Sequence, residues 1–300
     1  MKKLLSLFLS LMLLSVMVIP VSAAETSAPV LDSTSVYMDA DSKNTFAKQM
    51  DAKFATDLQN GSVKKGSVEE IEELMRQSTF ATGQEKEKIN QTLEKFGVYE
   101  YAPDLSPSTT IVPYSATNDV YLTTPSVFYE SWENTWTVTC GGNWRNDNWD
   151  EAILLGNIGG YDGFGVGYTN TTKPYQSSVV RSWGYIANKD SSVSVATSNR
   201  SDGDGSKGFG FRLQDYTRYN NDGTLGYVGY QWYGSSTYDS WFGTYSGLAT
   251  GYYIHTWAST SLTSVEFGVS GNTAGIKAVL SSSSNSFPAY SNDKIFGVYP

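Results

Sequence analysis

Large apolar or aromatic residues alternate with small or polar ones along many short runs of this 300-residue chain. Phe164, Val166 and Tyr168 alternate with glycines, and the runs at 209–213, 265–269 and 276–280 have the same period. A period of two is typical of β-strands that bury one face. Clusters of Gly, Asn, Asp and Ser separate these runs, and no proline occurs from 175 to 287. We therefore predict a mainly β domain over residues 114–300, as a two-sheet antiparallel sandwich of jelly-roll type, with a single closed barrel as the alternative.

The composition changes near residue 110. Only four of the 28 glycines precede that point, and all eight tryptophans follow it. Residues 25–102 have a helical pattern instead, in which Phe46, Met50, Phe54 and Leu58 recur every four residues. The sequence thus predicts a small helical N-terminal region, which is either a removable pro-segment or a permanent part of the fold.

Capping signals divide this helical region into shorter pieces. Ser67 with Glu70 and Thr82 with Glu85 have the spacing of capping boxes, in which each side chain accepts from the other residue's backbone. Gly97 follows the last apolar repeat and suits a left-handed helix terminus. We expect three short helices.

The first 24 residues have the layout of a secretory signal peptide. Lys2 and Lys3 precede an apolar run, which ends at Pro20 and is followed by small residues at 21–24. We expect a secreted protein of a Gram-positive bacterium, without a stable membrane anchor after cleavage. Residues 103–113 contain three prolines and a Ser/Thr run, which predicts an exposed linker.

The counts of chemically active residues exclude several classes of protein. Cys140 is the sole cysteine and His255 the sole histidine, so an internal disulfide is impossible and a zinc site rich in these residues is excluded. We interpret Cys140 as a buried, inert thiol. A formal net charge of −9 argues against a nucleic-acid partner. No cofactor and no metal are predicted, because the oxygen-rich segments 146–151 and 201–206 have the composition of turns between strands.

Residues 208–234 predict a hairpin with Asp222-Gly223 as a two-residue turn. The resulting register pairs Arg212 with Tyr233 and Tyr216 with Gly229. One face of this hairpin then carries rings, amides and guanidinium groups, which suit the C–H faces and hydroxyls of a sugar. The predicted ligand-binding residues are Arg212, Gln214, Tyr216, Arg218, Tyr227, Gln231 and Tyr233. The alternative is a solvated sheet face in which these side chains only pack on one another.

Catalysis has weaker support in the sequence. His255 lies on one strand face with Tyr253 and Trp257, but no pattern supplies a carboxylate to orient its ring, so we expect a packed histidine. A glycosidase would need two converging carboxyl groups. The glutamates available to it in the β-domain are Glu130, Glu133, Glu151 and Glu266.

In composition and expected architecture the chain resembles secreted β-sandwich proteins of Gram-positive bacteria, such as lectin-like or carbohydrate-binding modules. The aromatic-rich β-domain and the hairpin face predict a non-catalytic protein that binds an extracellular polysaccharide or cell-wall glycan. A secreted hydrolase with a helical pro-segment is the first alternative. The second is a membrane-active protein whose Ser/Thr/Gly-rich strands near 258–286 rearrange into a β-pore.

Overall fold

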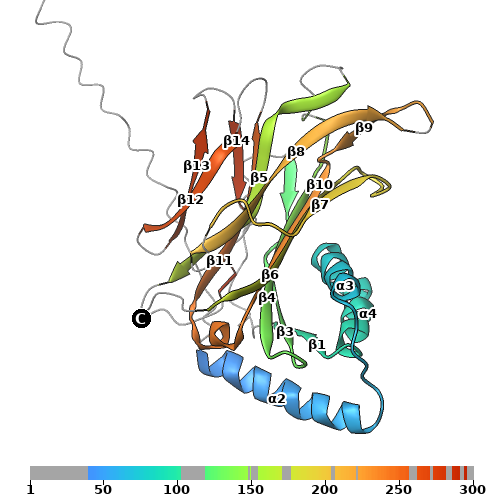
Figure 1. The fold of residues 1–300 in the computed structure, drawn as a ribbon, viewed down its shortest axis with the longest axis vertical. Helices are drawn as coiled ribbons and strands as arrows, with labels where there is room; N and C mark the ends of the chain where they lie inside the picture. The colour runs from blue at the N-terminus through green and yellow to red at the C-terminus, as the bar shows by residue number, and fades with distance from the viewer. Residues whose placement is uncertain are drawn as a thin grey trace, which may run out of the picture. The chain divides into compact units, whose positions relative to one another are not determined.

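A computed structural model describes residues 40–102, 119–147, 149, 155–170, 177–203, 207–220, 222–256, 262–270, 273–281, 286–290 and 294–295. The predicted signal peptide (1–24) and linker (103–113) lie outside the described residues. The chain divides into a unit of Met1–Thr34 and a unit of Ser35–Pro300, and every described residue belongs to the second. This part of the protein is mainly β, with antiparallel sheets and three helices, as the sequence predicts for its fold class (Figure 1).

The largest sheet, sheet A, has seven strands. Its main path runs through β1 (Val98–Glu100), β3 (Ser126–Glu130), β4 (Thr135–Trp144), β10 (Gln231–Tyr238), β6 (Val179–Ala187) and β7 (Ser194–Thr197). The remaining strand, β2 (Val120–Leu122), pairs with β4. Strand β10 is central and pairs along its length with both β4 and β6.

Sheet B has six strands, and a separate two-stranded sheet, sheet C, accompanies it. The path of sheet B runs through β14 (Ser286–Tyr290), β11 (Gly247–Thr256), β5 (Gly156–Asn170), β8 (Gly208–Tyr219) and β9 (Leu225–Val228), and β15 (Lys294–Ile295) pairs with β11. Sheet C consists of β12 (Leu262–Ser270) and β13 (Thr273–Leu280).

The main core contains the inward side chains of sheets A and B. Phe164 and Val166 of β5 and Phe211 of β8 are fully buried in it. Phe211 lies so close to Gly184 of β6 that a β-carbon on that glycine would collide with its ring. The thiol of Cys140 is buried in the same core, and burial raises its pKa, as expected of an unreactive cysteine.

Glycines on the outer face of sheet B admit further packing. A β-carbon at Gly163 would collide with Leu262 of sheet C, and one at Gly210 with the Tyr252 hydroxyl. Tyr252, Ile254, Leu262 and Val265 form a small buried cluster at this contact. The glycine alternation thus brings another layer of side chains against the strands.

Three helices precede the sheets: α2 (Ala40–Gln59), α3 (Val68–Phe80) and α4 (Gly83–Glu94). The Ser67 hydroxyl accepts from the Glu70 N–H, so this predicted cap is confirmed. The Thr82 side chain makes no capping bond, so the second predicted box is wrong. Gly97 has the predicted left-handed φ, at +72°. Among the described residues, no helix is both long enough and apolar enough to span a membrane.

Candidate functional site

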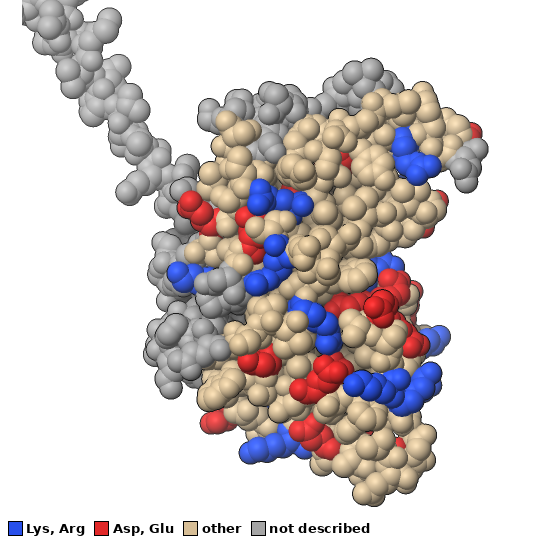
Figure 2. Space-filling view, viewed as in Figure 1, with Lys and Arg blue, Asp and Glu red and all other residues tan. Residues whose placement is uncertain are grey.

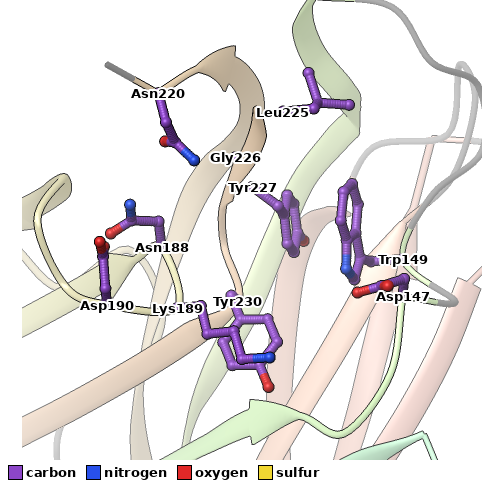
Figure 3. A pocket seen from close by; sticks show the side chains of 10 residues that line it. All are labelled: Asp147, Trp149, Asn188, Lys189, Asp190, Asn220, Leu225, Gly226, Tyr227 and Tyr230. Atoms are coloured by element: carbon purple, nitrogen blue, oxygen red, sulfur yellow. The ribbon is translucent and has the colours of Figure 1, made fainter. Parts of the chain in front are cut away.

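A pocket of about 300 Å³ lies where the loop after β6, the β8–β9 hairpin and the segment after β4 meet (Figure 3). Aromatic rings form its walls, and amide and charged groups surround them. The lining residues are Asp147, Trp149, Asn188, Lys189, Asp190, Asn220, Leu225, Gly226, Tyr227 and Tyr230. This volume is near the lower end of the range typical of small-ligand sites.

The aromatic walls are held by packing. The rings of Trp149 and Tyr227 stack with their centroids 4.2 Å apart and their planes within 7°. Both residues are buried, whereas Tyr230 is half-buried and has the Lys189 ammonium 5.5 Å from its ring centroid. These contacts hold flat apolar surfaces beside an exposed cation.

The polar rim is held by the tight turn between β6 and β7. The Asn188 amide donates to the Ser192 hydroxyl and accepts from the Val193 N–H. Asp190 accepts from the hydroxyl and the N–H of Ser192, and these bonds lower the pKa of its carboxyl. Asp190 is therefore an anion at neutral pH, next to the exposed Lys189.

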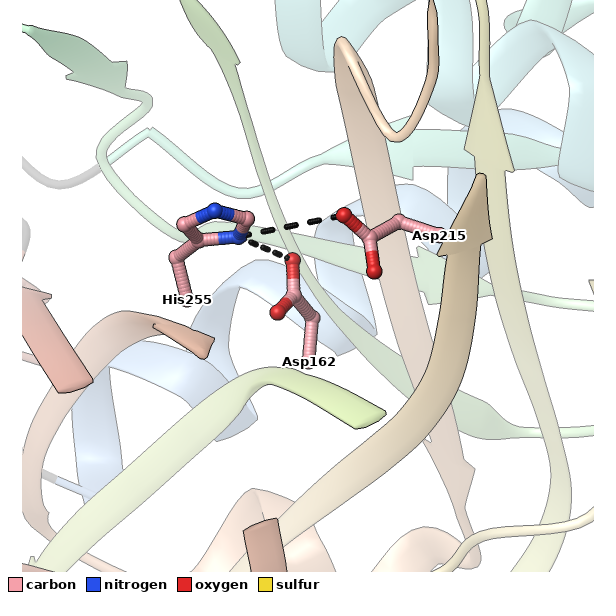
Figure 4. Close-up of side chains that lie close together, drawn as sticks. All are labelled: Asp162, Asp215 and His255. Atoms are coloured by element: carbon pink, nitrogen blue, oxygen red, sulfur yellow. Dashed lines mark hydrogen bonds and ion pairs between the residues drawn. The ribbon is translucent and has the colours of Figure 1, made fainter. Parts of the chain in front are cut away.

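A second cluster lies behind Tyr227 on the inward face of sheet B. It comprises Asp162 of β5, Asp215 of β8 and His255 of β11, which are adjacent strands (Figure 4). His255 Nδ1 lies 2.8 Å from Asp162 Oδ2 and 3.9 Å from Asp215 Oδ2. We refer to these three residues as the Asp–Asp–His cluster.

Strand pairing explains why the cluster forms. The β11–β5 register ends at the pair Ile254–Gly163, one position before His255 and Asp162, so these two side chains are cross-strand neighbours. The β5–β8 register shifts between Asn157 and Tyr161. Gly159, with φ +51°, lies inside this bulge. A bulge locally bends a strand and turns its side chains, and this one lies beside Asp162.

Neutral donors orient both carboxylates. The Tyr253 hydroxyl and the Thr256 N–H donate to Asp162 at 2.8 and 2.9 Å. The Tyr227 hydroxyl donates to Asp215 Oδ2 at 2.7 Å. Tyr227 therefore connects the two parts of the site, since its ring lines the pocket and its hydroxyl contacts the cluster.

The cluster is sealed from solvent. The exposed fractions are 3 % for Asp162, 1 % for Asp215 and 0 % for His255. In this arrangement the carboxylates cannot touch a substrate held in the pocket. They can share a proton with the imidazole or hold a cation. Asp162 is the carboxylate that orients the His255 ring, and no sequence pattern predicts it.

The predicted hairpin register is wrong. Tyr216 pairs with Val228 and Arg218 with Gly226, a shift of one residue from the expected pairs. The Asn220 N–H donates to the Thr224 carbonyl, and the Gly223 N–H to the Asn220 carbonyl. The turn is thus one residue longer than Asp222-Gly223 alone, with Gly223 at φ +81°.

The predicted sugar-binding face does not form either, because the chain changes sheets after Val228. Strand β10 belongs to sheet A rather than pairing with β8. The change occurs at Gly229, which has φ +151° and donates its N–H to Ala187. The predicted residues on β8 and those on β10 therefore lie in different sheets.

The four predicted residues of β8 make separate contacts. Arg212 forms an ion pair with Asp202 at 2.9 Å and donates to the Thr263 carbonyl of sheet C. Gln214 donates to the carbonyls of the β5 bulge. Tyr216 is half-buried against the main core, and Arg218 is exposed.

Of the other three predicted residues, only Tyr227 lies at the pocket. Gln231 accepts from Arg76 of α3 and from Ser191. Tyr233 is fully buried and donates to Glu72 of α3. The structure thus brings one of the seven predicted residues to the pocket.

Of the glutamates considered for catalysis, Glu130 and Glu133 both contact the Arg181 guanidinium, at 2.8 and 3.8 Å. Glu130 is buried, while Glu133 also lies 3.3 Å from Lys65. Glu266 is in sheet C opposite Lys277. Glu151 and Trp257 lie outside the described residues.

The oxygen-rich segments are described in part. Asn146 donates to Asp119, and Asp202 accepts from Arg212 and from the Val265 N–H. These contacts fit turn residues. Residues 148, 150–151 and 204–206 lie outside the described residues.

Sequence reasoning missed Asp162 and Asp215, although a signal for both exists. Each lies on the face of its strand that is otherwise apolar: Asp162 shares this face with Phe164 of β5, and Asp215 shares it with Phe211 of β8. A charged residue at an inward position requires a buried partner, so the pattern indicates that each aspartate has one but not which residue it is.

Comparison of the chain with protein-family models, curated proteins and solved structures found no match.

Proposed function

We propose that the protein is a secreted, non-catalytic binding protein whose pocket holds a sugar unit of an extracellular polysaccharide or cell-wall glycan. We infer that sheets A and B form a two-sheet sandwich of jelly-roll type behind a small helical N-terminal region. The ligand class is the one expected from the sequence, but the site lies in the pocket and not on the predicted hairpin face.

The stacked pair of Trp149 and Tyr227 carries this proposal. Together with Tyr230 it gives the pocket flat apolar walls, and Asn188, Asn220 and Asp190 add hydrogen-bonding groups. A sugar has the matching character, since its C–H faces pack on rings while its hydroxyls bond to amides and carboxylates.

Charge also favours a neutral ligand. Lys189 has Asp190 beside it in the chain, and Asp147 lies on the same pocket. On the visible face of the molecule, acidic and basic side chains are interspersed rather than gathered into a patch of one sign (Figure 2). Such mixed charge gives little attraction for a polyanion.

The first alternative, a hydrolase, has the paired carboxylates of the Asp–Asp–His cluster in its favour. They are sealed behind Tyr227, so a bound sugar would meet a phenol ring and not a catalytic acid. We therefore favour binding without catalysis.

The test is a binding assay on a panel of polysaccharides and peptidoglycan with the full chain and Tyr230→Ala. We expect the substitution to weaken binding about tenfold, or about 1.4 kcal/mol, because it removes an aromatic wall. Tyr219→Ala is the matched control, since Tyr219 is a tyrosine with 59 % exposure that does not line the pocket. Equal loss in both variants, or no binding to any glycan, would overturn the proposal.

A further inference from the structure

The side chains of the Asp–Asp–His cluster converge as metal ligands do. One ligand atom from each of Asp162, Asp215 and His255 lies within 4.8 Å of the other two. The three come from neighbouring strands of one sheet, so their backbones are fixed relative to one another (Figure 4). Strands hold a site more precisely than loops do.

The negative charge of the Asp–Asp–His cluster favours a bound cation. Two carboxylates with a neutral imidazole carry a charge of −2, and with a protonated imidazole −1. All three residues are at least 97 % buried, and holding carboxylates away from water costs free energy. One divalent cation bound to two carboxylates and a neutral imidazole makes the cluster neutral.

The groups around the cluster orient its carboxylates by hydrogen bonds. Tyr253 and the Thr256 N–H fix Asp162, and Tyr227 fixes Asp215. Such bonds orient carboxylate ligands in known metal sites, and a carboxylate has lone pairs enough to accept them and coordinate. The Trp144 ring, 5.1 Å from the imidazole, adds an apolar wall.

We propose that Asp162, Asp215 and His255 bind one divalent transition-metal ion of the zinc class. The imidazole nitrogen favours such an ion over calcium or magnesium, which prefer oxygen ligands. The ion takes the place of the proton between His255 Nδ1 and Asp162 Oδ2, and the bound imidazole is neutral with its remaining proton on Nε2. An imidazolium therefore releases one proton to solvent on binding, whereas a neutral Nδ1–H imidazole moves its proton to Nε2 and releases none. The bound ion stabilises the sheet that carries this pocket wall.

The test uses the full chain, made without a histidine tag and stripped with EDTA, and zinc chloride as the probe. We expect about one equivalent of zinc to remain after gel filtration and to raise the melting temperature. Asp215→Asn and His255→Gln should abolish both effects, while Asp41→Asn, which alters an exposed carboxylate on α2 outside the pocket, should change neither.

A measurement on the unmodified chain covers the case in which those variants fail to fold. His255 is the sole histidine, so the nitrogen NMR spectrum contains one imidazole. We expect its Nδ1 signal to shift on addition of one equivalent of zinc. An unchanged imidazole signal, or zinc binding that persists in folded Asp215→Asn, would overturn the proposal. Because the metal alone is the probe, this outcome is separate from glycan binding.

Discussion

Lys43 is an ionisable residue in a place where its charge is unfavourable. Its side chain is fully buried, donates to the Phe242 carbonyl at 2.7 Å and lies 4.7 Å from the Phe242 ring centroid. Burial lowers the pKa of Lys43 well below its usual 10.5. A single residue thereby couples the stability of the fold to pH.

The sign of that coupling is definite. Between the lowered pKa and 10.5 the unfolded chain binds the proton and the folded chain does not, so the free energy of unfolding rises with pH. The slope from this residue is at most about 1.4 kcal/mol per pH unit. Lys43→Met should remove it, and Lys48→Met, at an exposed site on the same helix, should not. Urea titrations from about pH 6 to about pH 10 measure this. If the free energy of unfolding of the wild type and of Lys43→Met changed with pH by the same amount, Lys43 would not be the source of the pH dependence.

At the scale of elements, α3 lies on sheet A through a polar contact. Its Glu72 is buried, accepts from the Ser235 hydroxyl at 2.8 Å, and lies 3.6 Å from Arg181. Burial raises the pKa of the Glu72 carboxyl, because these partners compensate only in part for lost hydration. Thr79 of the same helix bonds to Thr139 of β4. Specific polar pairs therefore fix the position of the helix.

Glu72→Ala should lower the free energy of unfolding by about 1–3 kcal/mol, because Ser235 and Tyr233 lose a buried acceptor. The loss of stability should not be larger, because the Arg181 guanidinium still has Glu130 as an ion-pair partner. Hydrogen exchange should show the greatest loss of protection in α3. Glu69→Ala, at an exposed site one turn earlier, is the control. Unchanged protection of α3 in Glu72→Ala would show that the contact does not hold the helix.

How far the sequence predicts this protein differs from element to element. Period-two alternation predicts the β class and the inward side chains of β5, because burial requires it. It does not predict which sheet a strand joins. Gly229 looks like any strand glycine, yet the chain changes sheets there. The one-residue hairpin shift has the same origin, since Asn-Asp-Gly is compatible with two loop lengths.

The candidate site depends on such long-range pairing. Asp162, Asp215 and His255 lie on strands that are adjacent only after the sheet has formed. Sequence spacing therefore gives no direct signal of their proximity. A local pattern predicts that Tyr227 binds ligand, and in the structure its ring lines the pocket while its hydroxyl donates to Asp215.

At the scale of the whole molecule, the helices and the strands of the Ser35–Pro300 unit share their cores. Phe46 of α2 lies 5.0 Å from Tyr101, and Phe54 packs edge-on against Trp132 at 4.8 Å, measured between ring centroids. Ile71 and Met75 of α3 are buried in one cluster with Phe128 of β3. Shared burial couples the stability of the helices to that of the sheet.

The helices and strands should therefore unfold in one transition. All eight tryptophans lie at or after Trp132, so their fluorescence reports on the strand-rich part, while circular dichroism at the helix band reports on the helices. In urea the two curves of the full chain should coincide. Phe54→Ala should shift both by the same amount, up to about 3 kcal/mol, whereas Leu58→Ala, at 45 % exposure, should shift neither. Loss of the helical signal before that of tryptophan would mean that α2, α3 and α4 unfold independently, as a removable pro-segment would.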